Sequence, residues 1–215
     1  MTRRSAMLLF PGFTALDAIG PYHALAALPG HEFSFVAEQP GPVTDGGKVT
    51  LHANHGIGEI DHVDLLIVPG GLTAVTMARN GHPLIDWIRR VHPTTTWTTS
   101  ICTGALMLGA AGVLDGLAAT THWFCHDELA TYGAIPTDQR VVRDGKVITA
   151  AGVSAGIDMA LMLTEIIAGT DYAQAVQLDM EYDPQPPLDA GHPRSAPAAV
   201  TTRLRDMYQA MLEQA

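Results

Sequence analysis

The chain has only two cysteines among its 215 residues, too few for a disulfide framework. Basic residues are also few, because 12 Lys and Arg stand against 22 Asp and Glu, which gives a formal net charge of −10. No cluster of basic residues occurs. Nucleic acids and anionic membrane surfaces bind clustered Lys and Arg, so we expect neither as a partner.

Long apolar runs are absent as well. No run approaches the roughly 18 residues of a membrane-spanning helix. Near the N-terminus, Arg3 and Arg4 precede an apolar run over 6–10, but this run is too short for a signal peptide and ends at Pro11. We therefore expect a cytoplasmic protein with reduced cysteines. Glycine-rich phosphate loops and the His-Glu-x-x-His zinc motif are missing too.

Apolar residues make up 47% of the chain, enough for a substantial core. Patterns typical of strands alternate with patterns typical of helices, which predicts an α/β sandwich around a mostly parallel sheet in a single domain over 1–215. Strands are expected over 5–10, 32–37, 63–68 and 95–101, short strands and loops over 41–60, and a hairpin over 141–149. Helices are expected over 14–28 with a break at Gly20-Pro21, and over 84–91, 154–168, 172–182 and 198–214, with a Pro-rich loop over 183–197.

Cys102 carries the strongest chemical signal. It stands between a β-branched run and a helical stretch, so its sulfur is expected at a sharp strand-to-helix turn, facing free N–H groups of the helix. Such a position lowers a thiol pKa and favours the nucleophilic thiolate. The N–H of Thr103 would point at an atom bonded to the sulfur, and Gly71 could supply a second N–H to an anion-stabilising pocket. A buried, inert cysteine is the alternative.

Asp17 follows the first predicted strand and has two interpretations. Thr14 with an acid three residues later resembles a helix capping box. Alternatively, the carboxyl group lies beside the thiol. A neighbouring thiolate would then keep it protonated, so that it could donate a proton during a reaction.

Two further motifs have weaker chemical readings. Gly152–Gly156 matches the Gly-x-Ser-x-Gly elbow of serine hydrolases, with His192 and Asp183 or Asp189 as partners, although a plain Ser154 helix cap is the simpler interpretation. His122, Cys125 and His126 have a spacing that resembles metal ligands. A complete site needs further ligands, so we expect no metal there, while His122 alone remains a possible partner of Cys102.

Several segments together resemble the DJ-1/PfpI superfamily, which is related to class I amidotransferases. They are the segments at 10–17, 68–71, 100–105, 112–123 and 151–158, and they span nearly the whole chain. The resemblance implies a flavodoxin-like sandwich with a cysteine nucleophile elbow. It also implies that Ser154 opens a helix near the nucleophile, that the Val153 N–H bonds the cysteine sulfur, and that Gly152 belongs to the same binding segment.

Within the superfamily the chain is similar to the isocyanide hydratase branch, through Asp17, the Cys-Thr-Gly elbow and the segment at 181–187. This resemblance implies a lyase that converts small-molecule isocyanides to N-substituted formamides. It further implies Cys102 as nucleophile, Asp17 as acid, a homodimer, and no metal or organic cofactor. A redox or stress-response protein with an oxidisable cysteine, and glyoxalase or deglycase chemistry on α-oxoaldehydes, are the alternatives.

Overall fold

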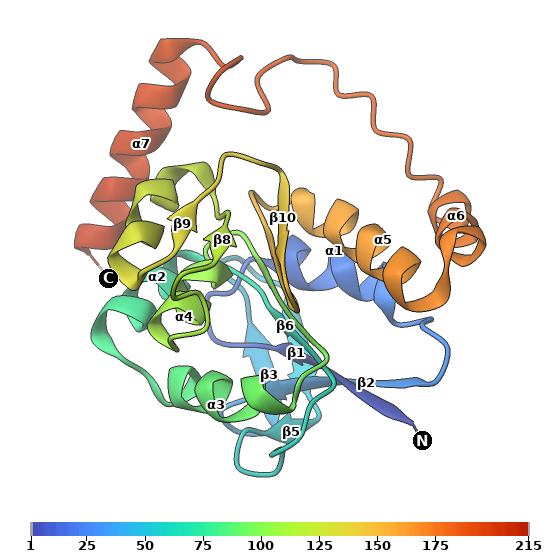
Figure 1. The fold of residues 1–215 in the computed structure, drawn as a ribbon. Helices are drawn as coiled ribbons and strands as arrows, with labels where there is room; N and C mark the ends of the chain where they lie inside the picture. The colour runs from blue at the N-terminus through green and yellow to red at the C-terminus, as the bar shows by residue number, and fades with distance from the viewer. Residues whose placement is uncertain (1, 215) are drawn as a thin grey trace.

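The computed structural model describes residues 2–214 and contains a seven-stranded sheet at its centre (Figure 1). The strand order is β10-β11-β7-β6-β1-β2-β5, and every neighbouring pair is parallel except β10 with β11. The strands are β1 (Arg3–Leu8), β2 (His31–Ala37), β5 (His55–Gly56), β6 (Leu65–Val68), β7 (Trp97–Ile101), β10 (Val141–Asp144) and β11 (Val147–Ala150). The predicted α/β fold with a mostly parallel sheet is confirmed.

Helices cover both faces of the sheet. α1 (Ala15–Leu25) packs against α5 (Ala155–Ala168), and α5 contacts β7 and β11. α2 (Leu72–Asn80) and α3 (Pro83–Val91) contact α4 (Gly104–Ala110), which lies against β6 and β7. β6 and β11 are fully buried, as expected for parallel strands covered on both sides.

Some elements differ from the sequence-based expectation. α1 continues through Pro21 instead of breaking there. Pro21 packs closely on α5, where a Cβ added to Gly156 would lie 3.0 Å from its Cγ, so tertiary contact outweighs the lost helix hydrogen bond. The sequence patterns did not indicate α2, the 3₁₀ segment Trp123–Tyr132, or the short pair β8 (Ala118–Ala119) and β9 (Ile135–Pro136). The 41–60 region holds the hairpin of β3 (Gly41–Thr44) and β4 (Thr50–Ala53), followed by β5.

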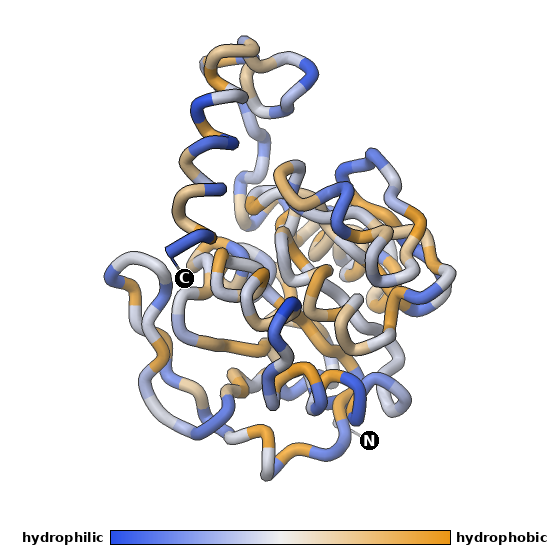
Figure 2. The backbone as a smooth tube through the Cα atoms, turned by 90° about the vertical axis from the view of Figure 1, so that its left-hand side faces the viewer, coloured by the Kyte–Doolittle hydropathy of each residue, from blue (hydrophilic) through white to orange (hydrophobic). Residues whose placement is uncertain are grey.

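The C-terminal part of the chain runs along the outside of the molecule. α6 (Thr170–Asp179) follows α5, and a long loop then leads to α7 (Ala198–Glu213). Figure 2 shows α7 standing at the edge of the body, and none of its residues is buried. Among residues 2–214, no helix is long and apolar enough to cross a membrane.

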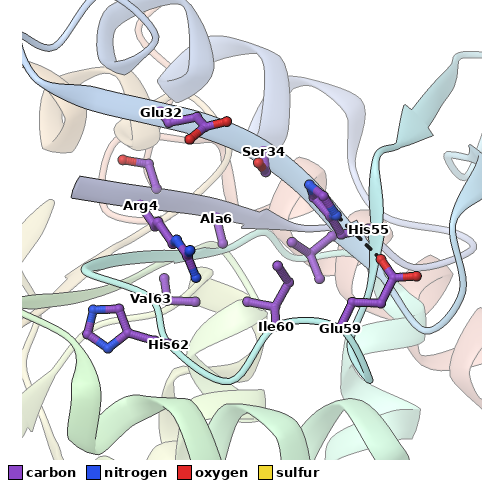
Figure 3. A pocket seen from close by; sticks show the side chains of 11 residues that line it. Arg4, Ala6, Glu32, Ser34, His55, Glu59, Ile60, His62 and Val63 are labelled. Carbon is purple, nitrogen blue, oxygen red and sulfur yellow. Dashed lines mark hydrogen bonds and ion pairs between the residues drawn. The ribbon is translucent and has the colours of Figure 1, made fainter. Parts of the chain in front are cut away.

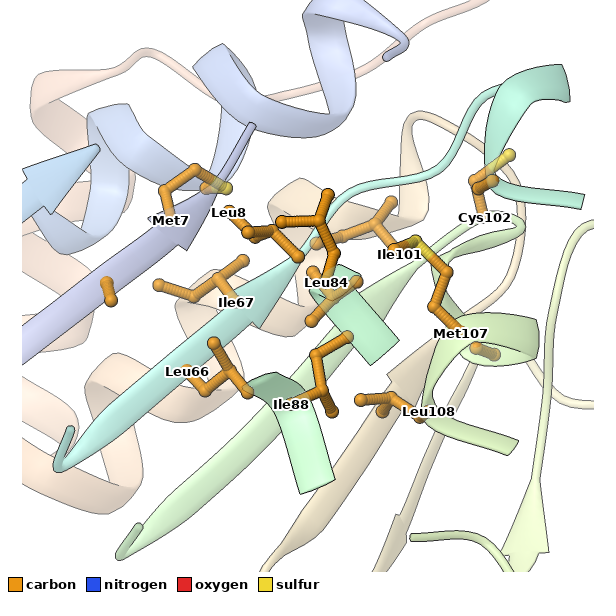
Figure 4. Close-up of a cluster of buried hydrophobic side chains, with 14 of the residues drawn as sticks. Met7, Leu8, Leu66, Ile67, Leu84, Ile88, Ile101, Cys102, Met107 and Leu108 are labelled. Atoms are coloured by element: carbon orange, nitrogen blue, oxygen red, sulfur yellow. The ribbon is translucent and has the colours of Figure 1, made fainter. Parts of the chain in front are cut away.

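The apolar core ends next to Cys102. Figure 4 shows side chains of β1, β6, α3 and α4 packed together, with Ile101 and Cys102 at one end of the cluster. The β6 and β7 chain turns meet closely there. A Cβ on Gly104 would lie 2.3 Å from the Val68 carbonyl oxygen, and one on Gly70 would lie 2.8 Å from Cys102 Cβ. The turn after each strand therefore accepts only glycine at these contacts.

The contact at Gly104 gives a prediction for stability. Gly104→Ala places a methyl group against backbone, which cannot move aside as a flexible side chain can, so we expect a loss of about 1–3 kcal/mol in the free energy of unfolding. Urea denaturation measures it. Gly58→Ala is the control, because an added Cβ there has no neighbour within 4 Å. Equal midpoints for the two variants would contradict the close approach.

Candidate active site

Three chain segments meet where the topology of the sheet reverses. β1 lies between β2 and β6, so the chain leaves β1 toward one side and later returns on the other. Ligands of open parallel sheets bind beyond the carboxyl ends of the strands at this kind of point. Asp17 follows β1, Gly70 and Gly71 follow β6, and Cys102 follows β7.

Cys102 occupies a strained turn between β7 and α4. Its φ is +54°, a left-handed value that is uncommon for a residue other than glycine, and its side chain is buried with 6% exposure. Its N–H donates to the carbonyl oxygens of Ala150 and Ala151 at 3.1 and 2.8 Å. Its carbonyl oxygen accepts from Thr121 Oγ1 at 2.7 Å. Hydrogen bonds on both sides hold the strained residue, a pattern typical of functional sites.

Asp17 is fully buried and does not act as part of a helix cap. The Thr14 side chain makes no capping hydrogen bond, so the capping-box interpretation is wrong. Asp17 Oδ2 instead accepts from the Gly70 N–H at 2.8 Å. Oδ1 has no partner with good hydrogen-bond geometry among residues 2–214, although a hydrogen-bonding interaction with the Cys102 side chain lowers the pKa of the carboxyl. The two side chains therefore interact without regular hydrogen-bond alignment.

The buried position of Asp17 changes its acidity. Loss of solvation by burial raises its pKa from 3.8 to about 7, against the lowering effects of the Gly70 N–H and the Cys102 side chain. A carboxyl group with this pKa holds its proton in an appreciable fraction of molecules at neutral pH. Asp17 can therefore both accept and donate a proton under those conditions.

The ionisation of Cys102 differs from the sequence-based expectation. Its pKa is raised well above the usual value, first by burial and then by the negative charge of Asp17, while the Thr103 N–H and side chain act in the opposite direction. The expectation that the N-terminus of the following helix lowers the pKa of the thiol is wrong, because the sulfur is buried beside a carboxyl group. The two side chains favour a single negative charge between them.

Thr103 and Gly71 form a structural clamp between the two turns. The Gly71 N–H donates to Thr103 Oγ1 at 2.8 Å, and the Thr103 hydroxyl donates to the Gly71 carbonyl oxygen, also at 2.8 Å. The Gly71 N–H is thus engaged, and the expectation that it serves as a free anion-stabilising donor is wrong. The Thr103 N–H keeps its expected position beside the sulfur, where it lowers the pKa of Cys102.

A cavity of about 820 Å³ lies close to the elbow, although neither Cys102 nor Asp17 is among its lining residues. Leu16, next to Asp17 in the chain, and Thr121, which bonds the Cys102 carbonyl, belong to its lining. Gly152 and Val153 line it as well, and their N–H groups donate to no protein acceptor within residues 2–214. They are therefore two of the backbone donors available to a ligand in this cavity.

The serine-hydrolase interpretation finds no support in the site geometry. Ser154 and His192 both line the cavity, but Ser154 Oγ accepts from Arg140 at 3.3 Å. His192 Nε2 lies 3.5 Å from Asp138 Oδ1 instead. Ser154 also makes no capping hydrogen bond, although it stands at the N-cap position of α5, so the simple cap interpretation is wrong too.

His122 and Cys125 lie near the cavity in an apolar setting. His122 Nδ1 accepts from the Phe124 N–H at 3.4 Å, and its ring packs against Trp123 and Tyr208. Burial lowers the pKa of His122 to about 4, so the ring is neutral at pH 7. Burial also raises the pKa of Cys125 to about 12, and this cysteine remains a thiol.

Sequence comparison places these features in a known family. The DJ-1/PfpI family profile matches residues 3–166. The chain belongs to the DJ-1/PfpI family. Isonitrile hydratase of Pseudomonas putida is 43% identical over 95% of the chain and 90% of its own length. A transcriptional regulator of the helix-turn-helix type from Pseudomonas aeruginosa is 29% identical over 79% of the chain, which covers 52% of the regulator.

Solved structures of DJ-1/PfpI proteins share the fold. A THiJ/PfpI family protein from Pseudomonas syringae superposes with a TM-score of 0.92 at 37% identity, covering 99% of the chain and 88% of that protein. DJ-1beta of Drosophila melanogaster superposes with a TM-score of 0.73 at 21% identity, covering 86% of the chain and all of that protein. The second likeness concerns the fold alone.

Sequence reasoning missed two contributors to this DJ-1/PfpI site. Gly70 donates its N–H to Asp17 and allows the β6 turn to approach Cys102. The Val68–Gly71 motif pointed to this place, but glycine spacing does not tell which amide is free. Thr121 bonds the Cys102 carbonyl oxygen across 19 residues, and nothing in the local sequence indicates that contact.

A second, smaller cavity of about 280 Å³ lies away from the Cys102 elbow (Figure 3). Its lining includes Arg4 and Glu32 at the starts of β1 and β2, together with His62, which precedes β6. It contains none of the residues that the sequence singled out as candidates for the site. The cavity beside Cys102 is the site that matches the sequence signals.

The pKa of Asp17 gives a prediction for stability against pH. Between pH 4 and 7 the unfolded chain ionises Asp17 while the folded protein keeps the proton, so the free energy of unfolding falls as pH rises. Since one pKa unit corresponds to 1.36 kcal/mol, this contribution amounts to about 4 kcal/mol. Asp17→Asn removes it. In urea denaturation at several pH values, the free energy of unfolding of the variant should rise relative to wild type between pH 4 and pH 8. A difference between the two proteins that does not change with pH would refute the raised pKa.

Proposed function

We propose that this DJ-1/PfpI protein hydrates isocyanides to N-substituted formamides, with Cys102 as nucleophile. The observation that carries the proposal is the 43% identity to isonitrile hydratase of Pseudomonas putida over 95% of the chain. The pairing of a buried cysteine with a buried, weakly acidic carboxyl group supplies the chemistry that the reaction needs. The redox and deglycase alternatives have weaker support, because a Drosophila DJ-1 protein and a Thermococcus deglycase match 57% and 64% of the chain at 28% and 29% identity.

The first step forms a covalent bond between the sulfur and the isocyanide. Asp17 takes the proton of the Cys102 thiol, and the sulfur attacks the terminal carbon. The electron pair that develops on this carbon then receives the same proton from Asp17, which gives a thioimidate. Both raised pKa values suit this proton transfer, because one negative charge moves between sulfur and carboxylate and two charges never build up together.

The second step releases the product. Water adds to the thioimidate carbon, and a proton reaches the imine nitrogen. The carbon–sulfur bond then breaks, which frees the formamide and restores the thiol. Dividing the reaction into two additions replaces one difficult step with two easier ones. We assign the N–H groups of Gly152 and Val153 to the negative charge that develops during these steps, and the Thr103 N–H to the sulfur. This scheme uses groups of the chain alone and requires no cofactor.

The proposal extends to the domain organisation, oligomeric state and cellular compartment of the protein. We infer a single domain over residues 1–215 that works as a homodimer in the cytoplasm. Cys102 and Cys125 are both free thiols, in agreement with a reducing compartment. Large apolar side chains such as Ile19 on α1 and Met207 and Met211 on α7 are more than one third exposed, and a second copy of the chain would cover surfaces of this kind.

The nucleophile assignment gives a direct prediction. Cys102→Ala should reduce hydration of cyclohexyl isocyanide to the uncatalysed rate, because no thioimidate can form. Formamide production measured by chromatography checks this. Cys125→Ala is the matched control, since Cys125 is buried, remains a thiol and takes no part in the proposed steps, and it should retain activity. Wild-type protein that forms formamide no faster than Cys102→Ala would refute the function.

The dimer proposal has its own measurement. Sedimentation equilibrium should give a mass twice that of the 22.8 kDa chain. A single species at the monomer mass, at the concentrations used for activity, would rule out the homodimer and leave the proposed reaction untouched.

A further inference from the structure

The Gly152–Gly156 motif lies in a polar network that the proposed steps do not use. Ser154 stands at the N-cap position of α5 without capping it, and its hydroxyl accepts from Arg140 instead. One turn further along the helix, the Asp158 carboxylate forms an ion pair with Arg140 Nε through Oδ2. Its Oδ1 accepts from the Tyr182 hydroxyl at 2.7 Å. Both carboxylate oxygens of Asp158 are thus committed.

This network joins three segments that are distant in the sequence. Arg140 directly precedes β10, Asp158 lies in the first turn of α5, and Tyr182 begins the long loop after α6. Burial and the bond to Asp158 raise the pKa of Tyr182, so its hydroxyl stays protonated and remains a donor. The start of α5 is therefore fixed from the β10 side and from the C-terminal loop together.

The network is also connected to the nucleophile through the backbone. The Ala151 N–H donates to the Arg140 carbonyl oxygen at 2.9 Å. The Ala151 carbonyl oxygen in turn accepts from the Cys102 N–H at 2.8 Å. Gly152 and Val153 follow immediately, so their free N–H groups lie between Ala151, which is bonded to Cys102, and Ser154, which is bonded to Arg140.

We propose that Arg140, Asp158 and Tyr182 are positioning residues that fix the first turn of α5 and the Ala151–Val153 segment before it, so that the Gly152 and Val153 amides keep their places in the cavity wall and Ala151 keeps its hydrogen bond to the Cys102 turn. This inference rests on the proposed function for its kinetic part. The Arg140 and Asp158 side chains are 54% and 32% exposed, so the ion pair contributes little to folding stability. Its effect belongs to the reaction rate and to the ionisation of the thiol.

The test compares three variants of the full chain. Tyr182→Phe and Asp158→Asn each remove part of the network, whereas Glu165→Gln alters another α5 carboxyl group whose partner, Thr170, lies outside it. We expect the first two to lower kcat for cyclohexyl isocyanide roughly 10- to 100-fold with little change in KM, as for displaced transition-state donors. Glu165→Gln should behave as wild type, and thermal unfolding checks that all three variants fold.

A second readout does not depend on isocyanide turnover. Iodoacetamide labelling of the Cys102 peptide, followed by mass spectrometry across pH, reports the ionisation of the thiol. Its midpoint should move to higher pH in Tyr182→Phe and Asp158→Asn, because a displaced Ala151 no longer holds the Cys102 turn in which the Thr103 N–H stabilises the thiolate. If Asp158→Asn does not fold, Tyr182→Phe alone decides.

An unchanged midpoint would overturn the positioning role, whether or not kcat falls. So would an equal loss of kcat and an equal shift of the midpoint in Glu165→Gln. If the wild-type protein does not hydrate isocyanides at all, the proposed function fails while a shifted labelling midpoint still supports the positioning role.

Discussion

The close approach of two chain turns is the constraint on which the site depends. The turn after β6 and the turn after β7 touch through backbone, with Gly70 against Cys102 and Gly104 against the Val68 carbonyl oxygen. Cys102 adopts a left-handed conformation at this contact, and the Gly70 N–H donates to the Asp17 carboxyl group. Nucleophile, acid and backbone donors are thus placed by the main chain, which holds positions more firmly than side-chain contacts on loops.

The unusual ionisation of the site follows from this packing. Water is excluded from Asp17, and the Gly70 N–H only partly compensates for the lost solvation. The neighbouring thiol loses its tendency to ionise for the same reason. An exposed cysteine at the N-terminus of a helix would have a lowered pKa, whereas the pKa values of buried Cys102 and Asp17 are both raised. Together they behave as a coupled pair with one charge, in which the position of the proton decides which atom can react.

Much of this arrangement was predictable from the sequence because the signals are local. β-branched runs predict the buried strands, and the placement of Cys102 between strand and helix predicts the elbow. The features that sequence reasoning missed come from contacts across the fold. The Gly71 N–H donates to Thr103, and Ser154 accepts from Arg140, so both groups are engaged by residues far away in the sequence. The raised pKa of Cys102 likewise comes from burial by other parts of the chain. Spacing along a sequence shows which polar groups are near a turn. The folded structure determines which of them already have a hydrogen-bond partner.

The low exposure of Cys102 has a consequence for the shape of reacting groups. Only 6% of this residue is accessible, so little of its surface is open to an approaching reactant. The terminal carbon of an isocyanide carries no substituent and sits at the tip of a linear group. The carbon of an ester or amide is flanked by two substituents in a plane and needs clearance on both sides. A buried thiol of this kind therefore favours reactants whose electrophilic carbon lies at a narrow end, over the acyl compounds that an exposed cysteine can attack.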